Sequence, residues 1–176
     1  AMIQWLLDHE GYASDFLALP GQSAADAAGG TTHTKATHLV IDTFEHPRRG
    51  YFLRASDLGL AEAGSDADIP VVVSDGELAL SEDVMAAELF AERAVDLADG
   101  STVTVKTSLT LLRESAHEYD MDTYAEHCGI PKATIIDLAK KYASHGRKAA
   151  VNCHGGMMSG NGFYAAFSVQ MLNLLA

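Results

Sequence analysis

The chain has 176 residues, of which 48% are hydrophobic, and this composition excludes a disordered chain. Its 24 acidic and 12 basic side chains give a net charge of −12, which disfavours binding to nucleic acid and to anionic membrane surfaces. No run reaches the roughly 18 apolar residues that a membrane-spanning helix needs. The chain begins and ends inside amphipathic helical patterns without stop signals, so we expect an internal fragment of a larger protein.

The first 19 residues predict two short amphipathic helices, because their apolar residues recur at helical spacing on either side of Gly11. Pro20 and Gly21 end this region. Residues 21–36 are rich in Ala, Gly, Ser and Thr, so they predict a surface loop with one weak helical turn at 24–28.

The middle of the chain carries β-prone runs separated by turn signals. The predicted strands lie at residues 37–42, 51–54, 70–73, 95–97 and 103–105. The first two are expected to form an antiparallel pair with a long turn, and the third to stop at 74–76. The last two are expected to form a hairpin closed by Asp99 and Gly100. We therefore expect a β-rich insertion over residues 33–106.

Downstream of this insertion the apolar spacing becomes helical and predicts three helices. The third is expected to begin near Pro131 and to stop at Gly146. Residues 149–153 predict a buried strand, followed by a glycine-rich turn and a helix from about Phe163. Together these elements predict an α/β fold, a single unit over residues 1–176 with helices around a small sheet and the β-rich hairpin insertion.

The turn at residues 154–162, His-Gly-Gly-Met-Met-Ser-Gly-Asn-Gly, carries four glycines. Glycine lets a ligand approach the backbone closely, and N–H groups at a helix start attract phosphate, so a pyrophosphate-bearing cofactor suits this turn. The spacing matches neither the dinucleotide-binding motif nor the P-loop, and tight packing is the alternative explanation. His154 and Asn161 can donate hydrogen bonds to an oxyanion or a pterin, or can serve as a backbone-bonded histidine and a capping asparagine.

No catalytic or metal-ligating residue is predicted. None of the eight histidines has the spacing of a zinc motif. Cys128 and Cys153 are interpreted as small hydrophobic residues, and Ser159 lacks the Gly-x-Ser-x-Gly setting of a hydrolase nucleophile. Charged residues around the first predicted hairpin are typical of a solvated turn face, with partner docking as the alternative. They are Glu45, Arg48, Arg49, Arg54 and Asp57.

Several stretches resemble known proteins. The stretches that resemble tetrathionate reductase catalytic subunits are residues 37–41, 46–48, 52–59 and 154–164. Residues 103–114 and 124–139 resemble the wider dimethyl-sulfoxide-reductase-like family of molybdopterin oxidoreductases. The resemblance extends over nearly the whole chain and implies a fragment of a molybdopterin oxidoreductase domain.

The resemblance implies a periplasmic enzyme of anaerobic respiration that reduces tetrathionate to thiosulfate at a molybdenum ion held by two molybdopterin guanine dinucleotides. It also implies a 4Fe-4S cluster in the full-length enzyme, whose cysteines, like the molybdenum ligand, are expected upstream. The fragment alone should therefore be inactive and hold no cofactor. The implied partners are the rest of the catalytic subunit, an iron–sulfur electron-transfer subunit, and also a membrane anchor subunit. The cofactor contacts implied for this chain are His154, Gly155, Ser159, Asn161 and Gly162.

Alternatives remain open for the function. Within the family, the full-length enzyme could instead reduce thiosulfate, polysulfide or arsenate. Outside it, the chain could be a non-enzymatic α/β module that binds an anion or a protein partner. If the chain is a fragment, it should expose apolar residues of its last helix, such as Phe167, Met171 and Leu175, and self-associate through them.

Overall fold

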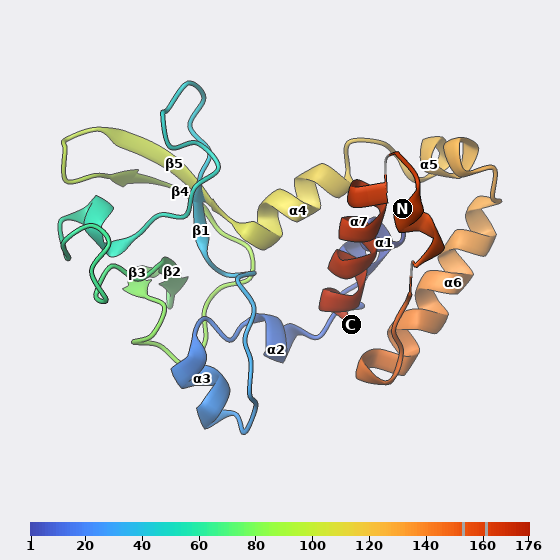
Figure 1. Cartoon of the computed structure of the whole chain (residues 1–176), viewed down its shortest axis with the longest axis horizontal. Helices are drawn as coiled ribbons and strands as arrows, with labels where there is room; N and C mark the ends of the chain where they lie inside the picture. The colour runs from blue at the N-terminus through green and yellow to red at the C-terminus, as the bar shows by residue number, and fades with distance from the viewer. Residues whose placement is uncertain (153, 161) are drawn as a thin grey trace. The chain divides into compact units, whose positions relative to one another are not determined.

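The structure is a computed structural model of residues 1–176, which describes every residue except Cys153 and Asn161 (Figure 1). The chain divides into two compact units. The β-rich unit comprises residues 14–112, and the helical unit comprises residues 1–13 together with 113–176. Helices and small sheets are mixed along the chain, which confirms the expected α/β composition.

The β-rich unit contains two small antiparallel sheets and three short helical elements. In chain order its elements are α2 (Ser14–Leu17), α3 (Gln22–Ala27), β1 (Leu39–Ile41), η1 (Ala55–Leu58), β2 (Val71–Ser74), β3 (Glu77–Leu80), β4 (Glu92–Asp96) and β5 (Thr102–Thr107). The first sheet has the order β1-β5-β4, and β2 and β3 form the second. The unit ends in the first half of α4 (Ser108–Ala116).

The core of the β-rich unit is aliphatic and draws on strands from both sheets. Its buried members are Leu39, Ile41, Leu53, Val71, Val73, Val95, Val103 and Val105. In β5, the side chains of Val103, Val105 and Thr107 are buried while their neighbours are not, the period of two that a half-buried strand requires. Burial of this aliphatic surface is therefore the main force that folds the unit.

The hairpin predicted at 95–105 is confirmed, whereas residues 51–54 pair with β1 and with Pro70 only through isolated bridges and do not form the predicted strand. Val40 bridges Phe52 in antiparallel fashion, and the Leu53 N–H donates to the Leu39 carbonyl at 2.8 Å. The hairpin at Asp99 and Gly100 joins β4 to β5. The stop expected at 74–76 is instead a two-residue hairpin turn from β2 into β3. Asp75 and Gly76 have φ values of 51° and 81° there, the left-handed conformation that such turns require.

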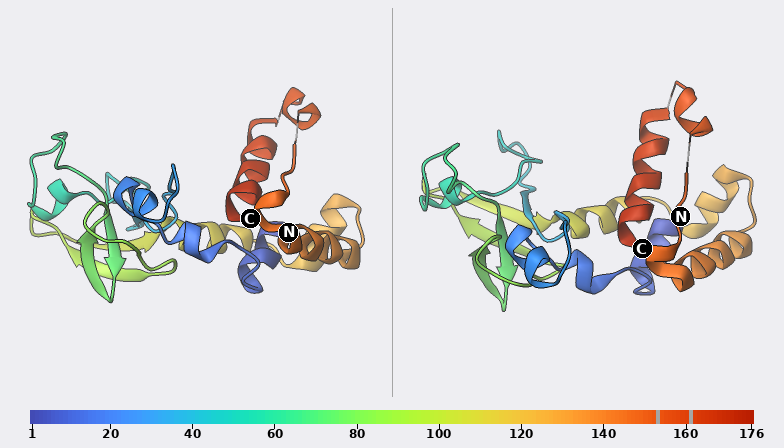
Figure 2. Two further views of the ribbon diagram at one scale, coloured as in Figure 1. Left: turned by 90° about the horizontal axis from the view of Figure 1, so that it is seen from below. Right: turned by 60° about the horizontal axis from the view of Figure 1, so that its bottom comes forward.

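The helical unit packs α1 (Met2–Asp8) against α6 (Lys132–His145) and α7 (Gly162–Leu175). Along the chain, α5 (Met121–Cys128) precedes α6, and η2 (Gly146–Lys148) and η3 (Gly155–Met158) lie between α6 and α7. Each of the three packed helices buries side chains, among them Leu6, Ala139, Tyr142, Leu172 and Leu175. Figure 2 shows that α7 meets α1 and α6 at its carboxyl end, while η3 and the amino end of α7 extend away from them.

Helix ends in this unit follow local sequence signals. The Asp120 carboxylate caps α5 by accepting from the Thr123 N–H at 2.7 Å, and Gly129 ends the helix in the left-handed conformation. The predicted limits of α6 are confirmed, with Pro131 at its amino end and Gly146 at its carboxyl end. The interruption predicted at Gly11 is also confirmed.

Candidate functional site at the glycine-rich turn

The segment that leads into the glycine-rich turn is not a strand, so the prediction of a buried strand over 149–153 is wrong for its described part. Residues 149–152 carry no ladder hydrogen bonds, and Ala150 and Asn152 are exposed. One side chain makes the hydrogen bonds that a neighbouring strand would otherwise make to this segment. Asn173 of α7 accepts from the Val151 N–H at 2.8 Å and donates to the Val151 carbonyl at 2.9 Å. Cys153 lies outside the described residues.

The turn itself forms η3 and then the start of α7. The His154 N–H donates to the Asn152 side chain at 2.9 Å, and the Gly162 N–H donates to the Ser159 carbonyl at 2.9 Å. These two hydrogen bonds hold the two ends of the turn. Both partners lie within three residues along the chain, so local hydrogen bonds contribute to the shape of the turn.

The predicted cofactor contacts differ in their exposure. His154, Gly155 and Ser159 are exposed, whereas Gly162 is buried. Asn161 lies outside the described residues. The structure thus places three of the five residues on an accessible stretch of backbone, and their contact with a cofactor stays a prediction.

The glycines of the turn serve two different purposes. A Cβ atom on Gly155 or Gly160 would meet nothing within 4 Å, so a ligand can approach the backbone closely at both positions. A Cβ atom on Gly162 would collide with the backbone of Met157, lying 2.8 Å from its Cα. Gly162 is therefore needed for packing within the turn.

The described part of the turn presents several groups that can form hydrogen bonds. It offers exposed backbone, the His154 imidazole and the Ser159 hydroxyl. Among the residues that the structure describes, no group of three or more His, Cys, Asp or Glu side chains is placed to hold a metal. The groups available here for contact with a ligand are the exposed backbone and the side chains of His154 and Ser159.

Large apolar side chains are exposed around the turn. Met157 and Met158 of η3 and Phe163, Tyr164 and Phe167 of α7 all lie at the surface. The exposure expected for Phe167 is confirmed, but the exposure expected for Leu175 is wrong, because Leu175 is 1% exposed. Leu175 lies at the carboxyl end of α7, where the helix packs on α1, and its carbonyl accepts from the Ala13 N–H at 2.7 Å.

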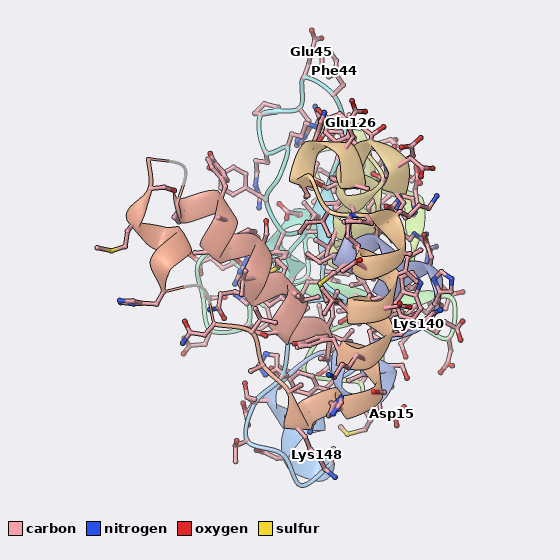
Figure 3. All side chains as sticks on the ribbon, turned by 90° about the vertical axis from the view of Figure 1, so that its right-hand side faces the viewer. Asp15, Phe44, Glu45, Glu126, Lys140 and Lys148 are labelled. Carbon is pink, nitrogen blue, oxygen red and sulfur yellow. The ribbon has the colours of Figure 1, made fainter. Side chains whose placement is uncertain are left out.

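Several of the charged residues around the first hairpin form ion pairs. Arg48 pairs with Asp57, and Arg49 pairs with Asp42 at 2.9 Å. Figure 3 shows Glu45 at the tip of its loop beside Phe44. Ion pairs thus fix the base of the hairpin while its tip stays solvated.

Asp68 completes this charged region, and sequence reasoning does not find it. Its buried carboxylate pairs with the Arg54 guanidinium at 3.1 Å and accepts from the N–H groups of Gly64 and Ser56, each at 3.0 Å. The Gly64 hydrogen bond is the main cause that holds the pKa of Asp68 well below its usual value, against the opposing effect of burial. Asp68 therefore organises the loop that joins η1 to β2. No local pattern marks it, because its partners lie 4 to 14 residues away.

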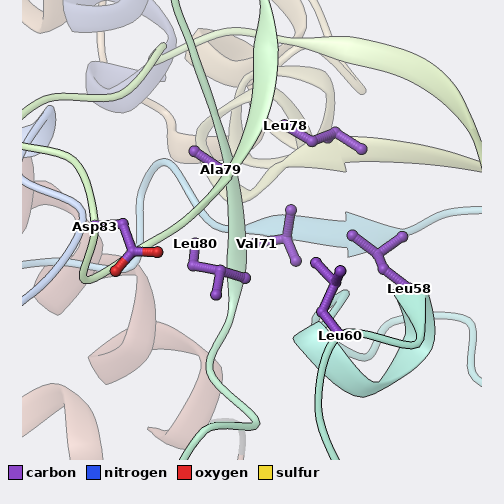
Figure 4. A pocket seen from close by; sticks show the side chains of 7 residues that line it. All are labelled: Leu58, Leu60, Val71, Leu78, Ala79, Leu80 and Asp83. Carbon is purple, nitrogen blue, oxygen red and sulfur yellow. The ribbon is translucent and has the colours of Figure 1, made fainter.

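Two grooves lie away from the turn. In the β-rich unit, a groove of about 320 Å³ is lined by aliphatic side chains and one carboxylate (Figure 4). Its lining residues are Leu58, Leu60, Val71, Leu78, Ala79, Leu80 and Asp83. In the helical unit, a groove of about 300 Å³ lies between α1 and α6 and includes Lys132, which pairs with Asp122. Neither groove contains a predicted site residue.

Cys128 does not behave as the small hydrophobic residue expected from the sequence. Its side chain is exposed at the carboxyl end of α5. The reason is that α5 buries none of its residues, so Cys128 has no buried position on this helix to occupy.

The whole chain aligns with subunits of known reductases. It is 48% identical over 176 residues to a tetrathionate reductase subunit of Salmonella typhimurium, an alignment that takes in 99% of this chain and 17% of that protein. It is 30% identical over 180 residues to a tetrathionate reductase subunit of Archaeoglobus fulgidus, with 99% and 15% aligned. It is also 30% identical over 180 residues to a selenate reductase subunit of Mesobacillus selenatarsenatis, with 99% and 16% aligned. No family model matches the chain.

These relatives confirm the resemblance to tetrathionate reductase catalytic subunits. The chain spans about a sixth of their length, so it corresponds to a segment of such a protein. Each relative is one subunit of its reductase, which implies that further subunits accompany it. Within the described residues, no helix combines the length and apolar character needed to cross a membrane.

Proposed function

We propose that the chain is part of a molybdenum bis(molybdopterin guanine dinucleotide) enzyme that reduces tetrathionate to thiosulfate, because it aligns with subunits of tetrathionate and selenate reductases. The single observation that carries the proposal is the 48% identity over 99% of the chain. In the proposed reaction two electrons cleave the central S–S bond of tetrathionate and yield two thiosulfate ions. When bound, the molybdenum–pterin group supplies the two-electron transfer.

The proposed role of this segment is to hold and shield, not to react. The open backbone at Gly155 and Gly160, with His154 and Ser159, would contact the outer edge of the cofactor. Asn173 fixes the approach to the turn through its two hydrogen bonds to Val151. The metal ligand and the cluster cysteines would come from the remainder of the subunit.

Selenate reduction is the second candidate, because one relative is a selenate reductase at 30% identity. The more distant tetrathionate reductase is equally similar, at 30%, so identity at that level does not separate the two substrates. The higher identity to the Salmonella typhimurium protein favours tetrathionate.

The test uses the intact subunit purified without oxygen, with a reduced viologen dye as electron donor. We expect dye oxidation with tetrathionate that exceeds the rate with selenate or arsenate by at least about tenfold, a free-energy difference of about 1.4 kcal/mol in the transition state. Molybdenum and pterin are measured in the same preparation. Turnover of selenate or arsenate without turnover of tetrathionate contradicts the substrate assignment, and a preparation that turns over without molybdenum contradicts the cofactor assignment.

The proposal extends to the setting of the enzyme. The accompanying proteins are proposed to be an iron–sulfur electron-transfer subunit, together with a membrane anchor, and the assembly is proposed to lie on the periplasmic side. Affinity purification of the intact subunit from membranes, followed by mass spectrometry of the bound proteins, tests this. Recovery of the subunit without partners from the soluble cytoplasmic fraction is the contrary result.

A further inference from the structure

The last part of the chain lacks acidic residues, lysine and arginine. Residues 149–176 contain no Asp, Glu, Lys or Arg, although such residues make up 20% of the chain. A stretch of 28 residues with average composition would carry about six of them. Lys148, labelled in Figure 3, is the last charged residue of the sequence. Depletion of this kind is typical of segments that are enclosed by protein, because a desolvated charge is costly unless it is paired.

The same segment exposes a set of large apolar side chains, which we call the terminal apolar face. Its members are Met157, Met158, Phe163, Tyr164 and Phe167, and each is between 53% and 81% exposed. The rings of Phe163 and Phe167 stack with centroids 6.3 Å apart, and Tyr164 meets Phe163 edge to face at 5.4 Å. The rings therefore form one continuous surface next to the glycine-rich turn.

We propose that the remainder of the same polypeptide packs on the terminal apolar face in the intact subunit, which places the glycine-rich turn at a domain junction. This rests on the proposed assignment to a long reductase subunit but not on its substrate. The aligned relatives are about six times as long as this chain. A covering segment in the same chain is tethered, so its effective concentration exceeds that of any free partner.

Charge distinguishes this occupant from a lipid surface. Helices that lie in a membrane interface carry Lys or Arg on their polar face, and this segment carries neither. The net charge of −12 also repels anionic lipid. Ligand sites occur preferentially at domain junctions, and a covered turn would present the open backbone at Gly155 and Gly160 to a cofactor in a space that excludes bulk water.

Methionine oxidation tests the proposal with native side chains. Met157 and Met158 belong to the face, and Met85, which is 54% exposed in the β-rich unit, provides a matched reference. The intact subunit, in its monomeric form, and the 176-residue chain are treated with dilute hydrogen peroxide beside a free methionine peptide. Peptide mass spectrometry then gives the oxidation rate at each methionine.

In the 176-residue chain, at a dilution where it is monomeric, all three methionines should oxidise at rates close to that of the free peptide. In the intact subunit, we expect Met157 and Met158 to oxidise about tenfold more slowly. Rates there that stay within about twofold of the free peptide overturn the proposal.

The proposal is also overturned if protection arises only on dimerisation of the intact protein, or only after the other subunits or phospholipid vesicles are added. In each case the face would belong to that partner. The measurement needs no substrate. A protected face in an enzyme that fails to reduce tetrathionate would leave this inference intact while contradicting the proposed function.

Discussion

Asn173 and Val151, 22 residues apart, are joined through both polar atoms of the Asn173 amide. The Tyr142 hydroxyl donates to the same Asn173 oxygen at 3.0 Å, so α6, α7 and the extended segment meet at one side chain. A side-chain amide can replace a neighbouring strand in this way because it presents one donor and one acceptor, as a peptide group does. The approach to the glycine-rich turn therefore depends on a single residue of the terminal helix.

Replacing Asn173 by aspartate tests this dependence. Asn173→Asp keeps the acceptor but removes the donor to the Val151 carbonyl, and it brings a carboxylate close to that oxygen. We expect the free energy of unfolding to fall by about 1–3 kcal/mol, and the Val151 amide hydrogen to exchange faster with solvent. Gln170→Glu, at an exposed position of the same helix, is the matched control and should change neither quantity. Unchanged exchange at Val151 in Asn173→Asp would show that the amide does not hold the segment.

Asp68 should make the stability of the chain depend on pH. The pKa of Asp68 is lower in the folded state than its usual value of 3.8, chiefly because of the Gly64 N–H. The folded state therefore binds this proton less readily than the unfolded state. The stability that Asp68 contributes is complete above the unfolded pKa and is lost as the pH falls through lower values.

Urea unfolding between about pH 3 and pH 6 measures this contribution. At the upper end, Asp68→Asn should lower the free energy of unfolding by about 2 kcal/mol, and the difference from the unchanged chain should shrink as the pH falls. Asp66→Asn, at an exposed neighbouring position, serves as the control. A difference that stays constant across this range would mean that Asp68 acts through packing and not through its charge.

The two kinds of glycine in the turn should respond differently to alanine. Gly162→Ala places a methyl group against the Met157 backbone, so we expect a loss of about 1–3 kcal/mol in a urea titration of the chain. Gly155→Ala meets no atom within 4 Å and should leave stability nearly unchanged. If the turn contacts the pterin cofactor, Gly155→Ala should lower the pterin content of the intact subunit. Equal stability losses for both variants would contradict the distinction.

The terminal apolar face should cause the 176-residue chain to associate when it is studied by itself. We expect the weight-average mass in sedimentation to rise with concentration, because exposed aromatic surface is buried on association. Phe167→Asp should abolish this rise, since it adds a charge at the ring stack. Phe44→Asp, at an exposed aromatic residue of the β-rich unit, should leave it unchanged. A chain that stays monomeric at all concentrations would contradict the expectation.

Local patterns predict most of the elements. The antiparallel pair around residues 39 and 53, the hairpin at Asp99 and Gly100 and the limits of α6 each follow from signals within a few residues. After β2 we expect from the sequence only the end of a strand, but the chain turns back into β3. Asp75 and Gly76 are themselves a hairpin signal, so the sequence contained this information. The strand expected at 149–153 fails for another reason, because its residues are apolar enough for a strand but no neighbouring strand pairs with the described ones.

The candidate site shows the same division. The sequence locates the glycine-rich turn and its four glycines, because glycine content is visible without a fold. It cannot separate Gly162, which packs on Met157, from Gly155 and Gly160, which face open space. Nor can it identify Asp68 or Asn173, whose roles arise from partners that folding brings to them.

Taken by itself, the sequence determined most of the order of helices and strands. It also determined that the last 28 residues contain no Asp, Glu, Lys or Arg, and that the chain is similar to tetrathionate and selenate reductases. All three results depend only on residue identity and spacing along the chain. Only the tertiary structure decided which polar groups are paired, which glycines are needed for packing and which apolar residues of the terminal helix lie at the surface. Those properties depend on distances between residues far apart in the sequence, and a side chain such as Leu175 is buried or exposed according to what the fold places beside it.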